Sequence, residues 1–206
     1  MRSFSGPDTG VIASLRDATV VLDDRAVFRR ASVELVPGVT VLRGANGAGK
    51  TTLLRALAGL VPLARGRRDV PQDVLYLGHR PQLLHGLTAR ENLRFLSELR
   101  GSRGDVSLAL ARWGLAGDAD RPVERLSAGQ RRRAALSRLA SERCDLVLLD
   151  EPFAELDADA ALLLRQSLTE QGAPTAILIA SHGHAELDEL AVRVYEVGDG
   201  GVVRTR

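Results

Sequence analysis

The chain has 206 residues, and its 28 basic side chains are nearly balanced by 26 acidic ones, leaving a formal charge of +2. This balance excludes a heavily basic protein that coats nucleic acids or membranes, and 45% apolar residues exclude a disordered chain. The length is enough for one large domain, and a single cysteine cannot form an internal disulfide, as expected in a reducing compartment.

Short apolar segments separated by turn residues dominate the first 80 residues. The apolar runs predict strands, in chain order, over Thr19–Leu22, Ser32–Val36, Val39–Leu42 and Val74–Leu77. A turn is expected at Asp23-Asp24, and a helix over Thr51–Ala58 that Gly59 ends. Residues 65–68 are interpreted as an exposed turn, and residues 1–10 as a loose leader.

Helices are predicted to replace strands between residues 87 and 140. One follows the capping-box spacing of Thr88 and Glu91, a second covers Asp105–Trp113, and a third begins near Ser127 and continues to Leu139. Alternation then resumes, with strand Leu146–Leu149, helix Ala158–Leu168, strand Ala176–Ile179, helix Ala185–Leu190 and edge strand Val192–Val197. Because the later strands are continuously apolar, they indicate a mostly parallel sheet, so the predicted class is α/β with an N-terminal antiparallel part.

A glycine-rich loop lies between the predicted strand Val39–Leu42 and the helix that follows. Its pattern, G-x-x-x-x-G-K-[ST], predicts a phosphate-binding loop made of Gly44, Ala45, Asn46, Gly47, Ala48, Gly49, Lys50, Thr51 and Thr52. Glycines let consecutive N–H groups point at phosphate oxygens, while Lys50 can reach the β- and γ-phosphates. The Thr51 hydroxyl is a candidate Mg²⁺ ligand. An ordinary glycine-rich turn is a poorer explanation, because Lys50 is the only lysine among 28 basic residues.

Two carboxylates, Asp150 and Glu151, directly follow the apolar run Leu146–Leu149. Ligand sites in α/β sheets lie at the carboxyl ends of strands, so these acids are candidates for the same site as the phosphate loop. Asp150 is expected to hold Mg²⁺, and Glu151 to orient or deprotonate an attacking water. The alternative, acids that merely end a strand in solvent, is weakened by the phosphate loop upstream.

The segment Leu126–Gln130 has the sequence Leu-Ser-Ala-Gly-Gln and opens a predicted helix. It resembles the L-S-G-G-Q signature of ATP-binding cassette (ABC) ATPases, with Ala128 in place of a glycine. Phosphate loop, signature, acidic pair and His182 at a later strand end follow one another in the order of that family. Nearly the whole chain therefore resembles one nucleotide-binding domain, expected over residues 11–206, with a helical subdomain at about 87–140.

The resemblance implies an ATPase that uses ATP and Mg²⁺ and works as a head-to-tail dimer, expected to be a homodimer. Each ATP would be held between the phosphate loop of one subunit and Ser127, Gly129 and Gln130 of the other. The resemblance assigns the catalytic and D-loop positions to Lys50, Glu151, His182 and Asp157.

A separate integral membrane permease is the partner that the resemblance implies, with the chain cytoplasmic and peripheral on the inner face of the cell membrane. The helical subdomain, with His79 to Leu87 at its base, is the expected docking surface. No nucleic-acid partner is expected. Soluble ABC ATPases that act on ribosomes or DNA remain an alternative, although they usually carry a second ATPase domain or a long coiled-coil insert. A non-hydrolysing ATP sensor is disfavoured by the acid at Glu151.

The sequence departs from the family pattern at two places. Leu22 stands where many members have an aromatic residue that stacks on adenine, so apolar contact without ring stacking is expected. His79 stands where the family has a glutamine that reaches Mg²⁺ or water, and Gln82 follows three residues later. Either His79 or Gln82 could take the role of that glutamine.

Four segments narrow the resemblance within the family: Leu77–His79, Gly86–Leu93, Leu126–Arg133 and Asp150–Phe153. Together they are similar to the ATP-binding subunits of haem exporters in cytochrome c maturation. An ABC ATPase that serves another substrate remains the alternative.

Six arginines crowd around the predicted signature helix: Arg121, Arg125, Arg131, Arg132, Arg133 and Arg138. They could form a phosphate or nucleic-acid surface, or a solvated helix face paired with neighbouring acids. The solvated face is favoured, because aromatic residues make up only 3% of the chain and provide few stacking platforms for bases.

Overall fold

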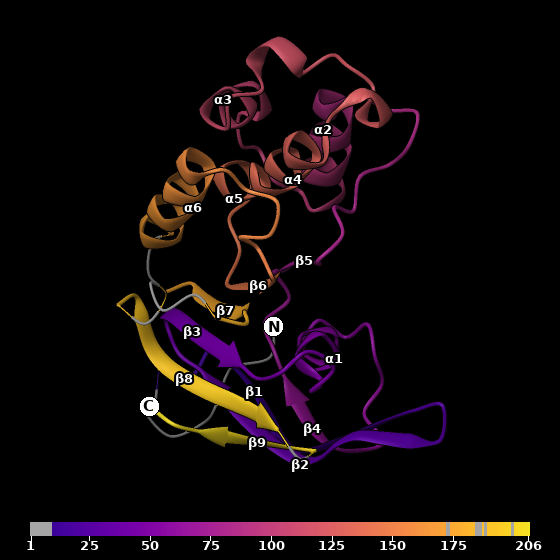
Figure 1. The fold of residues 1–206 in the computed structure, drawn as a ribbon, viewed down its shortest axis with the longest axis vertical. Helices are drawn as coiled ribbons and strands as arrows, with labels where there is room; N and C mark the ends of the chain where they lie inside the picture. The colour runs from indigo at the N-terminus through magenta and orange to yellow at the C-terminus, as the bar shows by residue number, and fades with distance from the viewer. Residues whose placement is uncertain (1–9, 172–173, 184–186, 188, 199) are drawn as a thin grey trace.

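A computed structural model of the protein describes residues 10–171, 174–183, 187, 189–198 and 200–206. Two sheets form one end of the molecule, and a lobe of helices forms the other (Figure 1). Within the described residues, no helix is long and apolar enough to cross a membrane.

The larger sheet has six strands in the order β5-β6-β7-β3-β8-β9. Their bounds are β3 Gly38–Arg43, β5 Val74–Leu77, β6 Leu146–Asp150, β7 Ala176–Ala180, β8 Ala191–Gly198 and β9 Gly201–Arg204. All pairs are parallel except β8 with β9. Asp150 and Leu42 both pair with Ala180, so β6, β7 and β3 end at the same edge of the sheet. The predicted α/β class with a mostly parallel sheet is confirmed.

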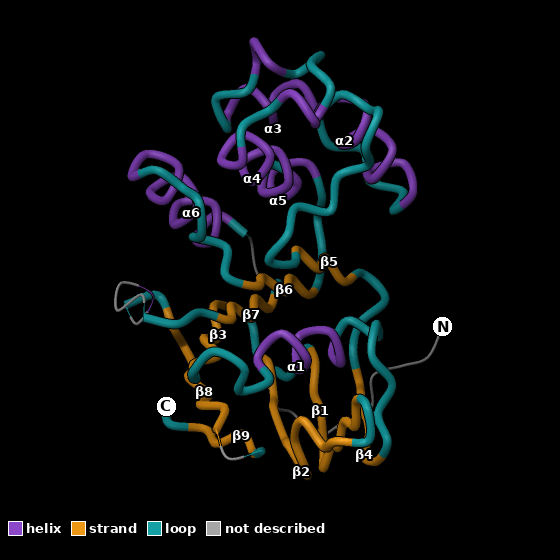
Figure 2. Tube along the Cα trace, turned by 45° about the vertical axis from the view of Figure 1, so that its right-hand side comes forward, coloured by secondary structure: helices purple, strands orange, loops and turns teal. Residues whose placement is uncertain are grey.

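Alternate residues of the buried strands β6 and β7 face two separate cores. Leu148 and Leu178 pack with helix α1 (Lys50–Leu57) and the smaller sheet. Leu149 and Ile179 pack instead with the helical lobe and with helix α6 (Ala158–Glu170). Helix α1 and the helical lobe therefore cover opposite faces of the six-stranded sheet (Figure 2).

The smaller sheet is antiparallel and contains β1 (Ala13–Leu22), β2 (Arg25–Leu35) and β4 (Arg65–Asp69), in the order β2-β1-β4. The turn expected between β1 and β2 is confirmed, with φ of 47° at Asp23 and 60° at Asp24. Two successive positive φ values are what a two-residue hairpin requires. Residues 65–68 are exposed as expected, but the expected turn is wrong, because this segment lies in strand β4, paired with β1.

Four α-helices form the lobe: α2 (Ala89–Leu99), α3 (Val106–Arg112), α4 (Ala128–Leu136) and α5 (Arg138–Ser141). The predicted capping box at Thr88 and Glu91 is present and begins α2. The helix expected to continue from Ser127 to Leu139 is interrupted at Ser137, whose hydroxyl donates to the carbonyl of Ala134 at 2.7 Å. A serine hydroxyl that bonds back to its own helix competes with the main-chain ladder.

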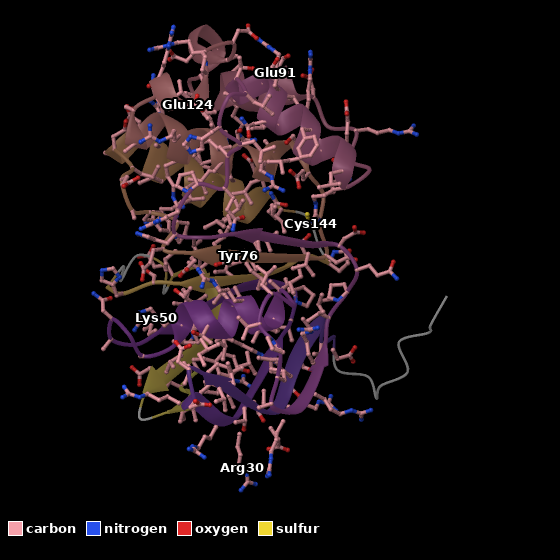
Figure 3. The ribbon with its side chains drawn as sticks, turned by 90° about the vertical axis from the view of Figure 1, so that its right-hand side faces the viewer. Arg30, Lys50, Tyr76, Glu91, Glu124 and Cys144 are labelled. Carbon is pink, nitrogen blue, oxygen red and sulfur yellow. The ribbon has the colours of Figure 1, made fainter. Side chains whose placement is uncertain are left out.

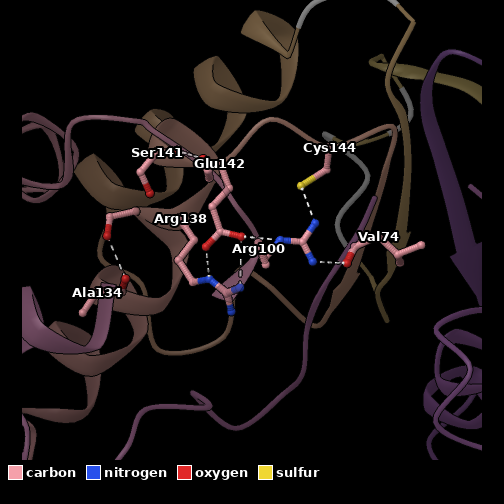
Figure 4. Close-up of polar contacts among 9 residues, drawn as sticks. Val74, Arg100, Ala134, Arg138, Ser141, Glu142 and Cys144 are labelled. Atoms are coloured by element: carbon pink, nitrogen blue, oxygen red, sulfur yellow. Dashed lines mark hydrogen bonds and ion pairs between the residues drawn. The ribbon is translucent and has the colours of Figure 1, made fainter. Parts of the chain in front are cut away.

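A buried charge network fastens the lobe to the six-stranded sheet (Figure 4). Glu142, at the end of α5, pairs with Arg138 at 2.5 Å and with Arg100 at 2.9 Å. Arg100, the residue after α2, also donates to the carbonyl of Val74 at 2.6 Å and to the sulfur of Cys144 at 3.2 Å. Because a buried carboxylate needs compensating charge, both arginines are tied to this position.

Two further predictions concern the C-terminal half. The segment Val192–Val197 lies in β8, which is not an edge strand, because the turn after it returns the chain as β9 and covers that edge. Of the helix expected over Ala185–Leu190, residues 185, 186 and 188 lie outside the described residues, as do residues 1–9 of the expected leader.

Candidate active site

The glycine-rich loop runs from the end of β3 to the start of α1. Gly44 has φ of 146°, and a side chain there would collide with the carbonyl oxygen of Val197. Gly49 has φ of 105°, and an added Cβ would lie 3.0 Å from the side chain of Val27 in the β1–β2 hairpin. These positions therefore need glycine for both backbone conformation and space.

Lys50 is the first residue of α1 and is 6% exposed (Figure 3). Its Nζ donates to the carbonyls of Gly44 at 2.7 Å and Ala45 at 3.1 Å. The same nitrogen lies 4.0 Å from Oε1 of Glu151. The ammonium thus sits inside the loop, where phosphate oxygens can replace the carbonyls as its partners.

Thr51 and Asp150, 99 residues apart in sequence, meet at this site. The Thr51 hydroxyl donates to Oδ2 of Asp150 at 2.8 Å, and Asp150 is 1% exposed. Mg²⁺ prefers oxygen ligands and is usually bound by one or two carboxylates together with substrate phosphates. This pair of oxygen donors beside a phosphate loop fits that requirement.

Glu151 occupies an unusual backbone conformation, with φ of 47°. A left-handed conformation costs a non-glycine residue about 1–3 kcal/mol and persists where the surroundings hold it in place. The amide of Glu151 donates to the carbonyl of Ala180 at the end of β7 at 2.9 Å. Its carboxylate lies 2.7 Å from Nδ1 of His182, and the side chain is 15% exposed. The carboxylate is therefore fixed, yet open enough to meet a water molecule.

The predicted signature, Leu126–Gln130, lies in the helical lobe and away from the phosphate loop. Ser127 caps α4, and its side chain forms a capping box with Gln130. Gln130 also donates to Asp118 at 2.8 Å, and Ser127 and Ala128 are exposed. Since α4 and α1 cover opposite faces of the six-stranded sheet, this part of the site is not brought to Lys50 within one chain (Figure 2).

Asp157, His79, Gln82 and Leu22 are the remaining candidate residues. Asp157 caps α6, where its carboxylate accepts from the amide of Ala160 at 2.8 Å. His79 and Gln82 are both exposed, so exposure does not decide which of them takes the role of the family's glutamine. Leu22 is 40% exposed, at the tip of the same hairpin that approaches Gly49.

Arg132 is a site residue that the sequence interpretation missed. The solvated helix face is wrong for Arg132, which is 1% exposed and donates only to main-chain carbonyls at the ends of β5 and β6. Burial lowers its pKa, although nearby Glu155, Asp150 and Glu151 oppose that shift. A signal was present, because Arg132 precedes the buried Leu136 by four residues and so shares its helix face.

Two other arginines of that cluster, Arg138 and Arg121, lie in different environments. Arg138 does pair with the neighbouring acid Glu142, but both side chains are buried, so the solvated part of the interpretation is wrong there too. Arg121 does pair with Asp118, at 2.5 Å on the surface. The interpretation therefore holds only for part of the cluster.

A phosphate loop between a parallel strand and a helix, with carboxylates at the end of the next strand but one, defines a P-loop nucleoside triphosphatase. The family model described as ABC transporter matches residues 28–154, and the chain belongs to this family. It is therefore an ATPase by family.

Named relatives cover most of the chain. "Cytochrome c biogenesis ATP-binding export protein CcmA 1" of Salmonella paratyphi A is 42% identical in an alignment 177 residues long, which covers 80% of this chain and 85% of that protein. The CcmA protein of Alcanivorax borkumensis is 39% identical in an alignment 193 residues long, which covers 88% of each chain. A solved structure titled "Structure of ATP binding subunit of ABC transporter" matches the fold with a TM-score of 0.87 at 21% identity, over 94% of this chain and 89% of the other.

Proposed function

We propose that this chain hydrolyses ATP at the site formed by Lys50, Thr51, Asp150, Glu151 and His182, and that it powers a separate membrane permease. The observation that carries the proposal is the meeting of Lys50, Glu151 and His182 at one sheet edge, with distances of 4.0 and 2.7 Å from the carboxylate. Phosphoryl transfer to water uses a cation that binds the phosphates and a group that orients the attacking water, and His182 would hold that group in place.

Each side chain has a separate task in this proposal. Lys50 exchanges its carbonyl partners for β- and γ-phosphate oxygens and offsets their charge. Thr51 and Asp150 would hold Mg²⁺, which would neutralise charge on the phosphates. Glu151 accepts a hydrogen bond from the attacking water and orients it toward the γ-phosphate. His182 holds the Glu151 carboxylate through Nδ1 and leaves Nε2 free to approach the γ-phosphate.

A second copy of the chain completes the site in this proposal. Ser127 and Ala128 are exposed at the start of α4, across the sheet from α1, so the signature is available to another molecule. In a head-to-tail dimer, Ser127, Gly129 and Gln130 of one subunit would close on the phosphates held by the other. Leu22 would contact the adenine by its apolar side chain. ATP binding would close the dimer, and hydrolysis would reopen it.

The permease is proposed to dock at the base of the helical lobe, between His79 and Leu87. Leu84 is 44% exposed there, and the buried Asn92 fixes its main chain by accepting from its amide at 2.6 Å and donating to its carbonyl at 3.1 Å. Asn92 thereby holds the loop that presents Leu84, and the family resemblance supports this loop as the docking surface. The names of the CcmA relatives support export in cytochrome c biogenesis as the process served, and the sequence resemblance adds haem as the proposed cargo.

The test of this function is ATP turnover of Glu151→Gln, which keeps the shape of the side chain but removes the base. We expect turnover to fall by about 100-fold or more, while nucleotide binding persists. Unchanged turnover would refute the assigned role. Co-expression with the neighbouring genes should recover a multi-span membrane protein with the chain. Recovery of ribosomal or other soluble partners alone would refute the transport role.

A further inference from the structure

The main chain of Glu151 is held from two sides. Its amide is bound to the end of β7, and its carbonyl accepts from Nη2 of Arg132 at 2.6 Å. The same Nη2 donates to the carbonyl of Asp150 at 3.1 Å, and Nε lies 3.4 Å from the carbonyl of Pro152. Arg132 thus contacts the carbonyls of three consecutive residues centred on the left-handed Glu151.

The other arm of the guanidinium binds a second segment of the chain. Its Nη1 donates to the carbonyls of Gly78 at 2.8 Å and His79 at 3.1 Å, directly after β5. One planar group therefore bridges the ends of β5 and β6. Lysine could not do the same, because its donors all lie on a single nitrogen whereas those of arginine form a rigid fork.

Helix α4, which carries Arg132, is capped by the exposed signature residue Ser127. A displacement of α4 must therefore move the guanidinium of Arg132. It would also move the main chain at the ends of β5 and β6, to which the guanidinium is hydrogen-bonded. Glu155, Asp150 and Glu151 lie near the guanidinium, yet its hydrogen bonds within the described residues go to main-chain carbonyls, and burying a charge in this way is costly. Packing alone therefore does not account for an arginine at this position.

We propose that Arg132 is a positioning residue that locks the backbone of Glu151 against the segment Gly78–His79 and so aims the catalytic carboxylate in step with the signature helix. This inference rests on the proposed function, because it acts through the role assigned to Glu151. The hydrogen bond from the Glu151 amide to the carbonyl of Ala180 fixes one side of that backbone. The hydrogen bond from Arg132 to the Glu151 carbonyl fixes the other side.

The experiment compares Arg132→Lys and Arg132→Gln with the wild type in steady-state ATP turnover and in equilibrium binding of a fluorescent ATP analogue. We expect kcat to fall by about tenfold or more in both variants, because small displacements of a catalytic group are costly. The Kd should stay within about twofold, because the phosphate loop is untouched. The control is Arg94→Lys, an exposed arginine on α2, which should keep both values.

A double-mutant comparison separates positioning from general structural damage. In the Glu151→Gln background, Arg132→Lys should change the residual single-turnover rate by less than about twofold, because the group that it positions is already inactive. An equal proportional loss in both backgrounds would overturn the inference. So would wild-type kcat in Arg132→Lys, or failure of both single variants to fold. If Glu151→Gln itself kept full turnover, the proposed function would fail instead.

Discussion

The hydroxyl of Thr51 donates a 2.8 Å hydrogen bond to the carboxylate of Asp150, joining the first turn of α1 to the end of β6. Strand β7 lies between β6 and β3 in the sheet. The bond therefore joins the helix that follows β3 to the end of β6, across the end of β7. Both oxygens are ready to be shared with a cation that also binds phosphate.

Thr51→Val removes this hydroxyl and keeps the shape of the side chain. We expect kcat to fall by about 100-fold and the Mg²⁺ concentration needed for half-maximal turnover to rise, because one oxygen ligand is lost. A Mg²⁺ titration of ATP turnover measures both effects. Thr169→Val, on the exposed face of α6, serves as the control. An unchanged Mg²⁺ requirement would contradict the role of Thr51.

His182→Ala leaves the Glu151 carboxylate without its 2.7 Å partner. We expect kcat to fall by about 10- to 100-fold, because the carboxylate loses one of the contacts that orient it. Binding of ATP should change less than turnover, which separates this variant from one that damages the phosphate loop. Single-turnover kinetics at saturating ATP measure the effect. A change in KM alone, with kcat retained, would count against this role.

Glu142 is the centre of the buried network that joins the helical lobe to the sheet. Glu142→Ala leaves the buried cation of Arg138 and the partly buried cation of Arg100 without their carboxylate, which lies 2.5 and 2.9 Å from them in the native chain. We expect the free energy of unfolding to fall by about 3–5 kcal/mol, measured by urea denaturation. Glu98→Ala, an exposed position on α2, should change it by less than about 0.5 kcal/mol. Equal effects would refute the network's importance.

Cys144, the only cysteine, is a probe of the same region. Burial raises the pKa of its thiol above the ordinary value of 9.0, and the contact with Arg100 only partly opposes this. The native thiol should therefore react slowly with a disulfide reagent, and rapidly once the chain is unfolded. Because its folded-state pKa is raised, the stability associated with the neutral thiol is present below the unfolded pKa and is lost as pH rises through the folded pKa. Equal reactivity of native and unfolded chain would contradict this burial.

Much of the phosphate loop and of the acidic strand end at Asp150 could be predicted from the sequence, because the patterns that indicate them are local. Glycine spacing, an apolar run and a following carboxylate place Lys50 and Asp150 on neighbouring elements, and parallel pairing brings them together. Strand β4 escaped prediction because Arg-Gly-Arg-Arg-Asp has no apolar alternation. That strand depends on a distant partner, since an added Cβ on Gly66 would lie 2.5 Å from the carbonyl oxygens of Arg16 and Asp17.

The burial of Arg132 could not be predicted from the sequence for a different reason. In a run of three arginines, a surface location is the natural expectation, because charged side chains are rarely fully buried. The carbonyls that receive it come from segments about 20 and 50 residues away in sequence, at the ends of two strands. Only the assembled fold supplies them.

The most direct measurement for the central claim is ATP turnover of Lys50→Arg, which keeps the charge of the side chain. The phosphate loop closes around a compact ammonium that is 6% exposed, so a planar guanidinium should not fit, and we expect most turnover to be lost. The reverse exchange on the same helix, Arg55→Lys at an exposed position, should leave turnover within about twofold of the wild type. Near-normal hydrolysis by a folded Lys50→Arg would contradict the proposed site.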